Sequence, residues 1–369
     1  MQKIKLKILT VFLFIFLGTS FLWAAGEVEQ TGNPVPADVS DWVPVTITDT
    51  AGNDITIQNP LERIVVAYYG CAEIMRSLDA DGRIVGVGKT ITDRPAYFPR
   101  LSKLPSTGKT TFNEAELILD LNPDAVIIGT GSRNSETRLK LLAVNPDLVV
   151  IQMAFYKPEF HEKEVKLLGE ILGQTEEAEI YLQFYNSILA KMGSEVDSIP
   201  LTDRPGVYLE STQDYKTGAP GSSWHPKILA AGGYNVYGDE QVSLPKVSAE
   251  SVVEKNPDII IKVSGWNMAD FGGYGVNSYD AMIAEKKIIE KRPAWNNIEA
   301  VQNNQVWIMY NDILGGPGYF IGLSYLAKII HPDLFRDFDP QSIHQEYLTR
   351  FQKLDFDLNT RGFFVYPGL

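Results

Sequence analysis

Short runs of β-branched residues, separated by amphipathic stretches, restrict the fold of this chain more than any other feature. The first half contains RIVVA (63–67), IVGVG (84–88), AVIIG (125–129) and LVVI (148–151). Uninterrupted apolar runs of this length are typical of parallel strands that are covered on both faces. Helical patterns lie between them, for example at 71–79 and 134–143. The alternation of strands and helices predicts a parallel α/β sheet.

The same alternation returns in the second half of the chain, with GVYLES (206–211), DIIIKV (258–263) and QVWIMY (305–310). Between the halves, residues 159–198 contain no proline and carry an apolar stripe at helical spacing. This segment is long enough for two helices that break near Gly173, the second running for about 22 residues from Thr175, or roughly 33 Å. We therefore predict two parallel-sheet α/β lobes joined by a single long helix.

The first 25 residues have the form of a secretory signal peptide. MQKIKLK carries three lysines, a long apolar run follows, and small residues near Ala24 and Ala25 offer a cleavage site. A single membrane anchor is the alternative, but the run is short for a membrane span. The only cysteine, Cys71, is too far along the chain to be a lipid-attachment site and has no partner for an intramolecular disulfide. We expect a soluble protein of the periplasm.

The composition places the remaining boundaries. Residues 26–42 are polar, acidic and proline-bearing, which predicts a flexible leader. VTITDTAGNDITI (45–57) alternates with period two around a turn and predicts a β-hairpin. The expected parts are then an N-terminal α/β lobe (43–174), a connecting helix (175–198), a C-terminal α/β lobe (199–335) and a C-terminal helix and tail (336–369), with the helix near 340–353 packing back.

The charge balance limits the partners. The formal net charge is -13, and loss of the three lysines of the signal peptide would change it to -16. A surface this acidic repels nucleic acid and anionic lipid head groups. A basic protein surface would be attracted instead.

One phrase occurs twice in the sequence. FNEAELILDLNPDAVII occupies 112–128 and VSAESVVEKNPDIII occupies 247–261. Glu116 and Glu250 each precede the proline of Asn-Pro-Asp by seven residues, whereas a third Asn-Pro-Asp has Leu139 at that position. Helix termination explains the Asn-Pro-Asp tripeptide in all three copies. It does not explain a carboxylate in only two of them.

Two interpretations of these glutamates stay open at this point. In the first, they support helix starts: Asn113 would be an N-cap with Glu116 three residues later, and Ser248 would precede an acid in the first turn. In the second, one exposed acid on each lobe forms a docking point for basic residues of a partner. The two roles are compatible.

The chain resembles the periplasmic binding proteins of ferric-siderophore and cobalamin ABC importers, whose two lobes are joined by one long helix. The resemblance covers about residues 44–335 and rests on five phrases in family order: RIVVAYYGCAEIMRSLDADGRIVGVG, NEAELILDLNPDAVI, SSWHPKILAAGGYNV, VSAESVVEKNPDIII and RPAWNNIEAVQNNQVWIM. It implies a ligand cleft between the lobes that closes by only a small hinge motion. It also implies that Glu116 and Glu250 meet arginines of the membrane permease.

Candidate ligand-binding residues follow from the sheets. Parallel sheets bind ligands outside the carboxyl ends of their strands, where loops and helix N-termini converge. The side chains expected there are largely aromatic, which suits a bulky ligand held without chemistry. They are Tyr68, Tyr69, Arg94, Tyr97, Arg133 and Tyr156 in the first lobe, and Tyr215, Trp224, His225, Trp266 and Tyr310 in the second.

Each of these side chains also has an ordinary structural interpretation. Arg94 and Arg133 would meet carboxylates or an anionic chelate, although the loop of Arg94 can equally point away. Tyr68 and Tyr310 can belong to the core. Trp266 can cover a glycine-rich loop, and His225 can simply begin a helix.

Other chemistry finds little support. The four histidines are scattered and do not form an obvious metal-ligand set, and phosphate-loop, nucleophile-elbow and zinc-protease motifs are absent from the sequence. We therefore predict a non-enzymatic, monomeric solute-binding protein without a cofactor, which captures an iron chelate and delivers it to an ABC permease. A ferric siderophore is favoured over cobalamin or haem, and a direct metal-ion binder or a cleft hydrolase are the remaining alternatives.

Overall fold

A computed structural model describes residues 42–108, 114–265 and 271–369. The predicted signal peptide and all but the last residue of the predicted leader lie outside these ranges, as do Asn113 and Trp266. Within the described ranges, no helix has the length and apolar content needed to cross a membrane.

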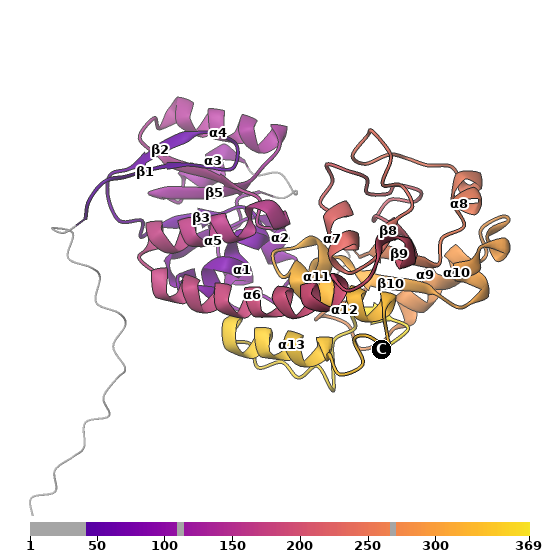
Figure 1. The fold of residues 1–369 in the computed structure, drawn as a ribbon. Helices are drawn as coiled ribbons and strands as arrows, with labels where there is room; N and C mark the ends of the chain where they lie inside the picture. Colours follow the sequence, from indigo (N-terminus) through magenta and orange to yellow (C-terminus); the bar gives the residue numbers. More distant parts are fainter. Residues whose placement is uncertain (1–41, 109–113, 266–270) are drawn as a thin grey trace, which may run out of the picture. The chain divides into compact units, whose positions relative to one another are not determined.

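The first lobe is built on a four-stranded parallel sheet in the order β4-β3-β5-β6. Its strands are β3 (Ile64–Val66), β4 (Ile84–Val87), β5 (Ala125–Gly129) and β6 (Val149–Met153). Its helices are α1 (Tyr69–Ser77), α2 (Lys89–Thr92), α3 (Ala115–Leu119), α4 (Ser132–Val144) and α5 (Pro158–Leu172), with 3-10 turns at Asp81–Arg83 and Leu101–Lys103. Every residue of β3 and β6 is buried, because helices cover both faces of the sheet (Figure 1).

The hairpin predicted over 45–57 is present as β1 (Val45–Thr48) and β2 (Asp54–Ile57), paired antiparallel. Its turn is held by Asp49, whose Oδ1 accepts from the backbone N–H groups of Ala51 and Asn53. Asp49 Oδ2 accepts from the N–H of Gln152 in β6. The hairpin is thereby attached to the edge of the first sheet.

One helix of 22 residues, α6 (Thr175–Val196), follows the first lobe. The preceding helix α5 ends at Gly173, which adopts the left-handed conformation that favours glycine. Buried residues recur along α6 at helical spacing, among them Ala178, Tyr181, Tyr185 and Ile188. The helix packs against α1 of the first lobe and against α7 and α12 of the second, and it is therefore the connecting helix that the sequence predicted.

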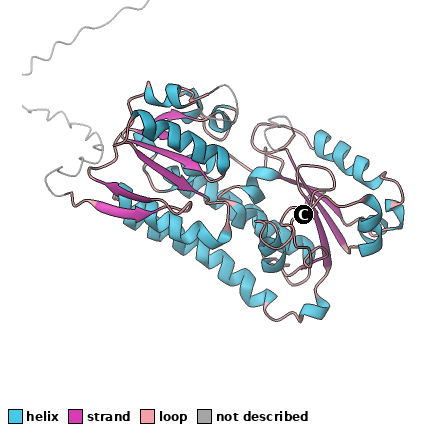
Figure 2. Ribbon diagram, turned by 90° about the horizontal axis from the view of Figure 1, so that it is seen from above, coloured by secondary structure: helices cyan, strands magenta, loops and turns pink. Residues whose placement is uncertain are grey.

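The second lobe contains a five-stranded sheet in the order β11-β10-β9-β7-β8, seen from above in Figure 2. Its strands are β7 (Gly206–Glu210), β8 (Tyr234–Asn235), β9 (Ile259–Ser264), β10 (Val306–Tyr310) and β11 (Val365–Tyr366). Its helices are α7 (His225–Ala230), α8 (Ala249–Lys255), α9 (Asp280–Glu290), α10 (Glu299–Gln302), α11 (Asn311–Gly315) and α12 (Tyr319–Ile330), with 3-10 turns at Leu201–Asp203 and Trp295–Asn297. All pairings are parallel except that of β11. The predicted α/β class with two parallel sheets is confirmed.

The C-terminal segment contains a strand that the sequence did not predict. Helix α13 (Pro340–Glu346) begins at the N-cap Asp339 and continues into one π-helical turn at Tyr347–Phe351. The chain then returns to the second sheet, where β11 pairs antiparallel with β10. Two residues of the predicted tail, Val365 and Tyr366, therefore form an edge strand of the second lobe.

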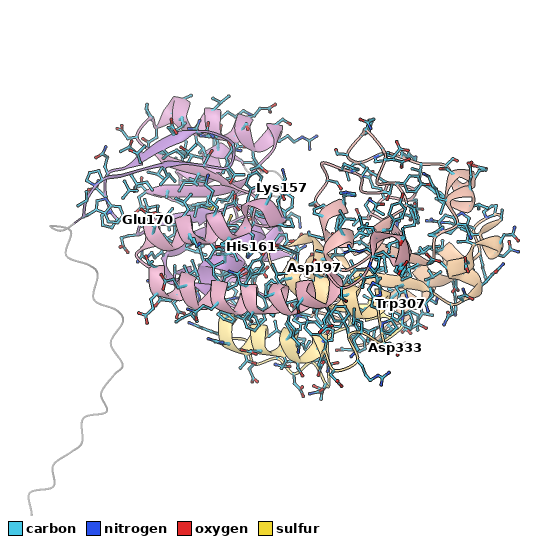
Figure 3. The ribbon with its side chains drawn as sticks, viewed as in Figure 1. Lys157, His161, Glu170, Asp197, Trp307 and Asp333 are labelled. Atoms are coloured by element: carbon cyan, nitrogen blue, oxygen red, sulfur yellow. The ribbon has the colours of Figure 1, made fainter. Side chains whose placement is uncertain are left out.

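An aromatic cluster joins α5, α6 and α12 around His161, which Figure 3 labels. Its ring stacks on Tyr185 with the ring centroids 4.6 Å apart. Nδ1 donates to the carbonyl of Phe155 at 2.8 Å, and Nε2 accepts from the Tyr181 hydroxyl at 3.0 Å. The side chain is fully buried, and this burial lowers the pKa of His161 to about 4.

The stability of the folded protein should therefore fall in acid through His161. The unfolded chain binds this proton near pH 6.5 and the folded chain only near pH 4, so the contribution is intact above pH 6.5 and is lost as the pH falls towards 4, by up to about 1.4 kcal/mol per pH unit. His161→Phe removes the imidazole that binds this proton and keeps the other titratable groups. Urea unfolding at pH 7 and pH 4.5 should show a smaller acid-induced loss for the variant. Equal losses would contradict the assignment.

Candidate functional site

Two of the predicted tyrosines meet at the carboxyl edge of the first sheet. Tyr68 follows β3 and Tyr156 follows β6, and their rings make an edge contact with centroids 6.4 Å apart. Both side chains are half-buried. A Cβ atom at Gly70 would lie 2.6 Å from the Tyr68 ring, so glycine is needed there to leave room for the aromatic side chain.

Arg94 and Tyr69 contact the second lobe. Arg94 makes a bidentate ion pair with Asp312 of α11, through Nε at 2.6 Å and Nη2 at 3.1 Å. Both side chains are about nine-tenths buried. The guanidinium also lies 4.7 Å from the centroid of the Tyr69 ring. In this conformation the charge of Arg94 is neutralised by a carboxylate of the protein rather than presented to a ligand.

Tyr97 and Tyr310 are nearly enclosed. The Tyr97 ring stacks on Tyr274 with centroids 4.5 Å apart and an interplanar angle of 16°. The Tyr310 ring lies under a glycine loop, where a Cβ atom at Gly265 or Gly273 would lie within 2.7 Å of it. Both of these glycines have a positive φ. The core interpretation of Tyr310 matches its burial, and Tyr97 has the same character.

Tyr215 is held by an ionic cluster inside the second lobe. The Arg292 guanidinium lies 4.4 Å from the centroid of its ring and makes two hydrogen bonds to Glu210, at 2.7 and 2.9 Å. Lys262 donates to Glu210 at 2.8 Å and to Asp214 at 3.0 Å. Burial alone would raise the pKa of Glu210, but the bonds from Arg292 and the charge of Lys262 hold it below its ordinary value.

Trp224 and His225 begin helix α7 and are half-buried. His225 Nδ1 lies 3.0 Å from Asn235 Nδ2, and burial lowers the pKa of this imidazole. The face of Trp224 lies towards the ammonium of Lys227, 5.3 Å from the ring centroid. Lys227 also donates to the carbonyl of Tyr156. The structure therefore brings Trp224 of the second lobe and Tyr156 of the first towards one lysine.

Two predicted site residues remain, Arg133 and Trp266. Arg133 is exposed in the first turn of α4, and Trp266 lies outside the described residues. No group of three or more metal-ligating side chains occurs within the described ranges. The ligand roles of all eleven residues stay predictions.

The two repeated glutamates are both exposed. Glu116 lies in the first turn of α3 and Glu250 in the first turn of α8. Ser248 is the N-cap of α8, and its hydroxyl accepts from the N–H of Ser251. The N-cap of α3 is Glu114, one residue later than expected. A side-chain cap bond is thus present at α8, from Ser248, but not at α3, and both repeated glutamates are at the surface.

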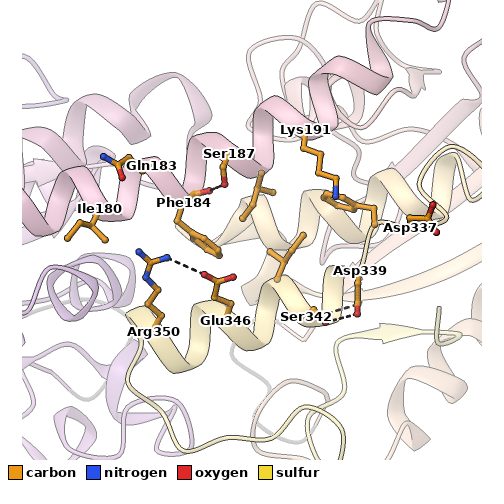
Figure 4. Close-up of a pocket in the computed structure, with 13 residues that line it drawn as sticks. Ile180, Gln183, Phe184, Ser187, Lys191, Asp337, Asp339, Ser342, Glu346 and Arg350 are labelled. Carbon is orange, nitrogen blue, oxygen red and sulfur yellow. Dashed lines mark hydrogen bonds and ion pairs between the residues drawn. The ribbon is translucent and has the colours of Figure 1, made fainter.

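A surface groove of about 560 Å³ lies away from these residues, between α6 and the C-terminal helices (Figure 4). Its polar rim includes the ion pair between Glu346 and Arg350 and the Lys191 ammonium, which lies 5.1 Å from the centroid of the Phe338 ring. Neither sheet contributes a residue to this groove. It is not the site that the strand ends predict.

The sequence did not predict four residues that contact the candidate site residues: Asp312, Lys227, Tyr274 and Arg292. Most of the contacts are distant in sequence: 218 residues separate Arg94 and Asp312, and 71 separate Tyr156 and Lys227. Only the contact of Lys227 with Trp224 is local. A buried lysine inside the apolar start of a helix, WHPKILAA, was the one available signal.

Two parallel-sheet lobes bridged by a long helix, with aromatic side chains at the strand ends, define a class of two-lobed ligand-binding proteins. The profile of the family described as periplasmic binding protein matches residues 64–312. The chain belongs to this family, as its sequence suggested.

Known proteins support the same class. The chain is 25% identical over 340 residues to an uncharacterised ABC transporter substrate-binding lipoprotein, YvrC, of Bacillus subtilis, covering 86% of this chain and 98% of the relative. It is 26% identical over 280 residues to a cobalamin-binding protein of Halobacterium salinarum (73% and 71%) and 22% identical over 280 residues to the iron(3+)-hydroxamate-binding protein FhuD of B. subtilis (72% and 79%).

Solved structures agree with the fold. The TroA-like periplasmic binding protein FepB of Veillonella parvula superposes with a TM-score of 0.71 at 25% identity, covering 87% of this chain and 99% of that one. The molybdate-bound protein MolA of Haemophilus influenzae superposes with a TM-score of 0.69 at 21% identity, covering 85% and 99%. The chain is thus an extracytoplasmic substrate-binding protein of the ABC transporter type.

Removing the carboxylate of Asp312 should destabilise the protein strongly. Asp312→Ala leaves the buried guanidinium of Arg94 without its counter-charge, which costs about 3–5 kcal/mol. Urea unfolding of the purified variant measures this loss. The matched control is Asp333→Ala, which breaks the exposed pair with Arg336 and should cost less than about 1 kcal/mol. Similar losses in both variants would show that the buried pair of Arg94 and Asp312 stabilises the fold no more than an exposed ion pair does.

Proposed function

We propose that this protein captures a metal chelate, most favourably a ferric siderophore, outside the cytoplasm and delivers it to an ABC permease. The observation that supports the proposal is that half-buried aromatic residues of both lobes lie near Lys227, which contacts the Trp224 ring and the backbone carbonyl of Tyr156. Tyr68 and Tyr156 come from the first lobe and Trp224 from the second. Rings that are partly exposed can bury a bulky ligand with little loss of side-chain entropy.

The proposed cargo is supported by the relatives rather than by any bound molecule. One relative binds iron(3+)-hydroxamate and another binds cobalamin. Tyrosines and an exposed arginine at the strand ends of this chain favour an iron chelate. Cobalamin is the second candidate, because the cobalamin-binding relative has the higher sequence identity.

We further propose that the mature protein is free in the periplasm. Cys71 is buried in α1, and the proposed signal peptide precedes it in the sequence. YvrC is a lipoprotein, so the two proteins would differ in how they are retained. Fractionation of cells that express the full chain, with metabolic lipid labelling, separates free from anchored protein.

The cargo can be identified directly. Protein taken from its own periplasm should show a bound mass in native mass spectrometry and a visible absorption band. Titration with a ferric hydroxamate, a ferric catecholate, cyanocobalamin and molybdate, followed by tryptophan fluorescence, then ranks the affinities. Saturable binding without product formation supports the proposal, and turnover of any of these compounds overturns it in favour of a hydrolase.

Docking to the permease is proposed for Glu116 and Glu250. Glu116→Arg combined with Glu250→Arg should leave ligand affinity unchanged and abolish uptake, because exposed acids at helix starts carry no packing role. Uptake of radiolabelled cargo by cells measures the effect. Glu170→Arg with Asp333→Arg is the matched control, since both of its acids are exposed (Figure 3). Loss of affinity in the first double variant, or loss of uptake in the control, would contradict specific docking.

The role of Trp224 makes a separate prediction. Trp224→Ala should weaken binding by about 1 kcal/mol or more, roughly fivefold, if its ring stacks on the ligand. Isothermal titration measures the change. Trp307→Ala is the control. This half-buried tryptophan lies near the start of β10, whereas the candidate site lies at the carboxyl ends of the strands. Unchanged affinity in the Trp224 variant would remove this residue from the site.

A further inference from the structure

Lys227 lies in helix α7 of the second lobe and yet makes a hydrogen bond to the first. Only 1% of its surface is exposed. Its Nζ donates to the carbonyl of Leu314 in α11 at 2.7 Å and to the carbonyl of Tyr156, directly after the first sheet, at 3.2 Å. This ammonium therefore connects the main chain on the two sides of the candidate ligand site.

The surroundings of Lys227 are aromatic rather than acidic. Nζ lies 5.3 Å from the centroid of the Trp224 ring and 4.7 Å from that of Tyr319. Among the described residues, no carboxylate is within ion-pair distance of it, in contrast to Arg94 with Asp312. Burial of an ammonium without a counter-charge costs stability, whereas a methionine of similar length would not carry that cost.

We propose that Lys227 is a positioning residue of the ligand site, which holds Tyr156 of the first lobe and Trp224 of the second in their binding positions. The inference rests on the proposed function, because those two side chains are proposed ligand contacts. The bond to the Tyr156 carbonyl fixes the backbone that carries one ring, and the cation fixes the face of the other. Lys227 acts through these rings and does not itself contact the ligand.

The charge of Lys227 is sensitive to pH. Burial lowers the pKa of its ammonium to about 7, and the carboxylate of Glu159 opposes this shift only in part. The other titratable groups near it are His161 from α5 and Tyr319 from α12, and His225 lies two residues earlier on its own helix. A neutral amine still donates hydrogen bonds, but they are weaker than those of an ammonium, and its attraction to the ring faces is lost.

The first test uses the protein without ligand. Lys227→Met keeps the apolar stem and removes the donors, so amide hydrogen exchange over 154–161 and 222–228 should become about tenfold faster. Lys286→Met is the matched control, because Lys286 is also buried and donates to a backbone carbonyl, that of Val306, within the second lobe. Its exchange in the two segments should equal that of the wild type. Unchanged exchange in Lys227→Met overturns the proposal.

The second test measures affinity for whichever of the four probes the wild type binds. At pH 6, Lys227→Met should bind at least about fivefold more weakly than the wild type. At pH 8.5 the difference should narrow, since the wild-type lysine has lost its charge. Lys286→Met should follow the wild type at both values. A ratio that does not change with pH would assign Lys227 a packing role and overturn the proposal.

A third variant covers the case in which Lys227→Met does not fold. Lys227→Arg stays charged at both pH values, so its affinity should vary less between pH 6 and pH 8.5 than that of the wild type. Equal variation would overturn the proposal. If the wild type binds none of the probes while the exchange result holds, the proposed cargo fails and the positioning role of Lys227 stands.

Discussion

The relation between the two lobes depends on a junction of buried polar side chains around helix α1. Every residue of α1 is buried, including Glu73 and Arg76. Glu73 accepts from the hydroxyl of Tyr347, and Arg76 donates to Gln352, so the C-terminal segment satisfies both charged groups. Burial raises the pKa of Glu73 to about 7, although Tyr347 and Arg76 oppose the shift. Buried polar groups need hydrogen-bond partners, and hydrogen bonds are directional. The lobes are therefore oriented by hydrogen bonds as well as by apolar packing.

The aromatic side chains of the candidate site form two groups that differ in burial. Tyr69, Tyr97 and Tyr310 are nearly enclosed where the lobes and the glycine loop meet. Tyr68, Tyr156 and Trp224 stay half-buried at the strand ends. The first group is enclosed by packing, whereas the second keeps part of its side-chain surface exposed. Aromatic residues predicted from the same sequence feature therefore differ in burial, and only the tertiary contacts distinguish them.

The sequence predicted the architecture because its signals are local. Continuous apolar runs gave the long strands, and the spacing of apolar residues gave α6 from Thr175. The strands β8 and β11 have only two residues each, too few for a period to be visible. The site was predicted as a set of strand ends, but the fate of each side chain depends on distant partners. For Arg94 the sequence left open whether it faces a ligand or points away. Its partner Asp312 is 218 residues distant, and no local sequence pattern predicts the pair. The two glutamates were found because their spacing repeats, and a repeat needs no knowledge of long-range contacts.

The final strand has a consequence for how the chain acquires its structure. β11 supplies residues 365–366 to the free edge of β10, about 55 positions after that strand in the sequence. Until those residues arrive, β10 presents unpaired backbone groups, which other chains can pair with. The second sheet is therefore incomplete at this edge in any state in which residues 365–366 are not in place. A substitution or fusion that displaces Val365 and Tyr366 would expose the same backbone groups of β10.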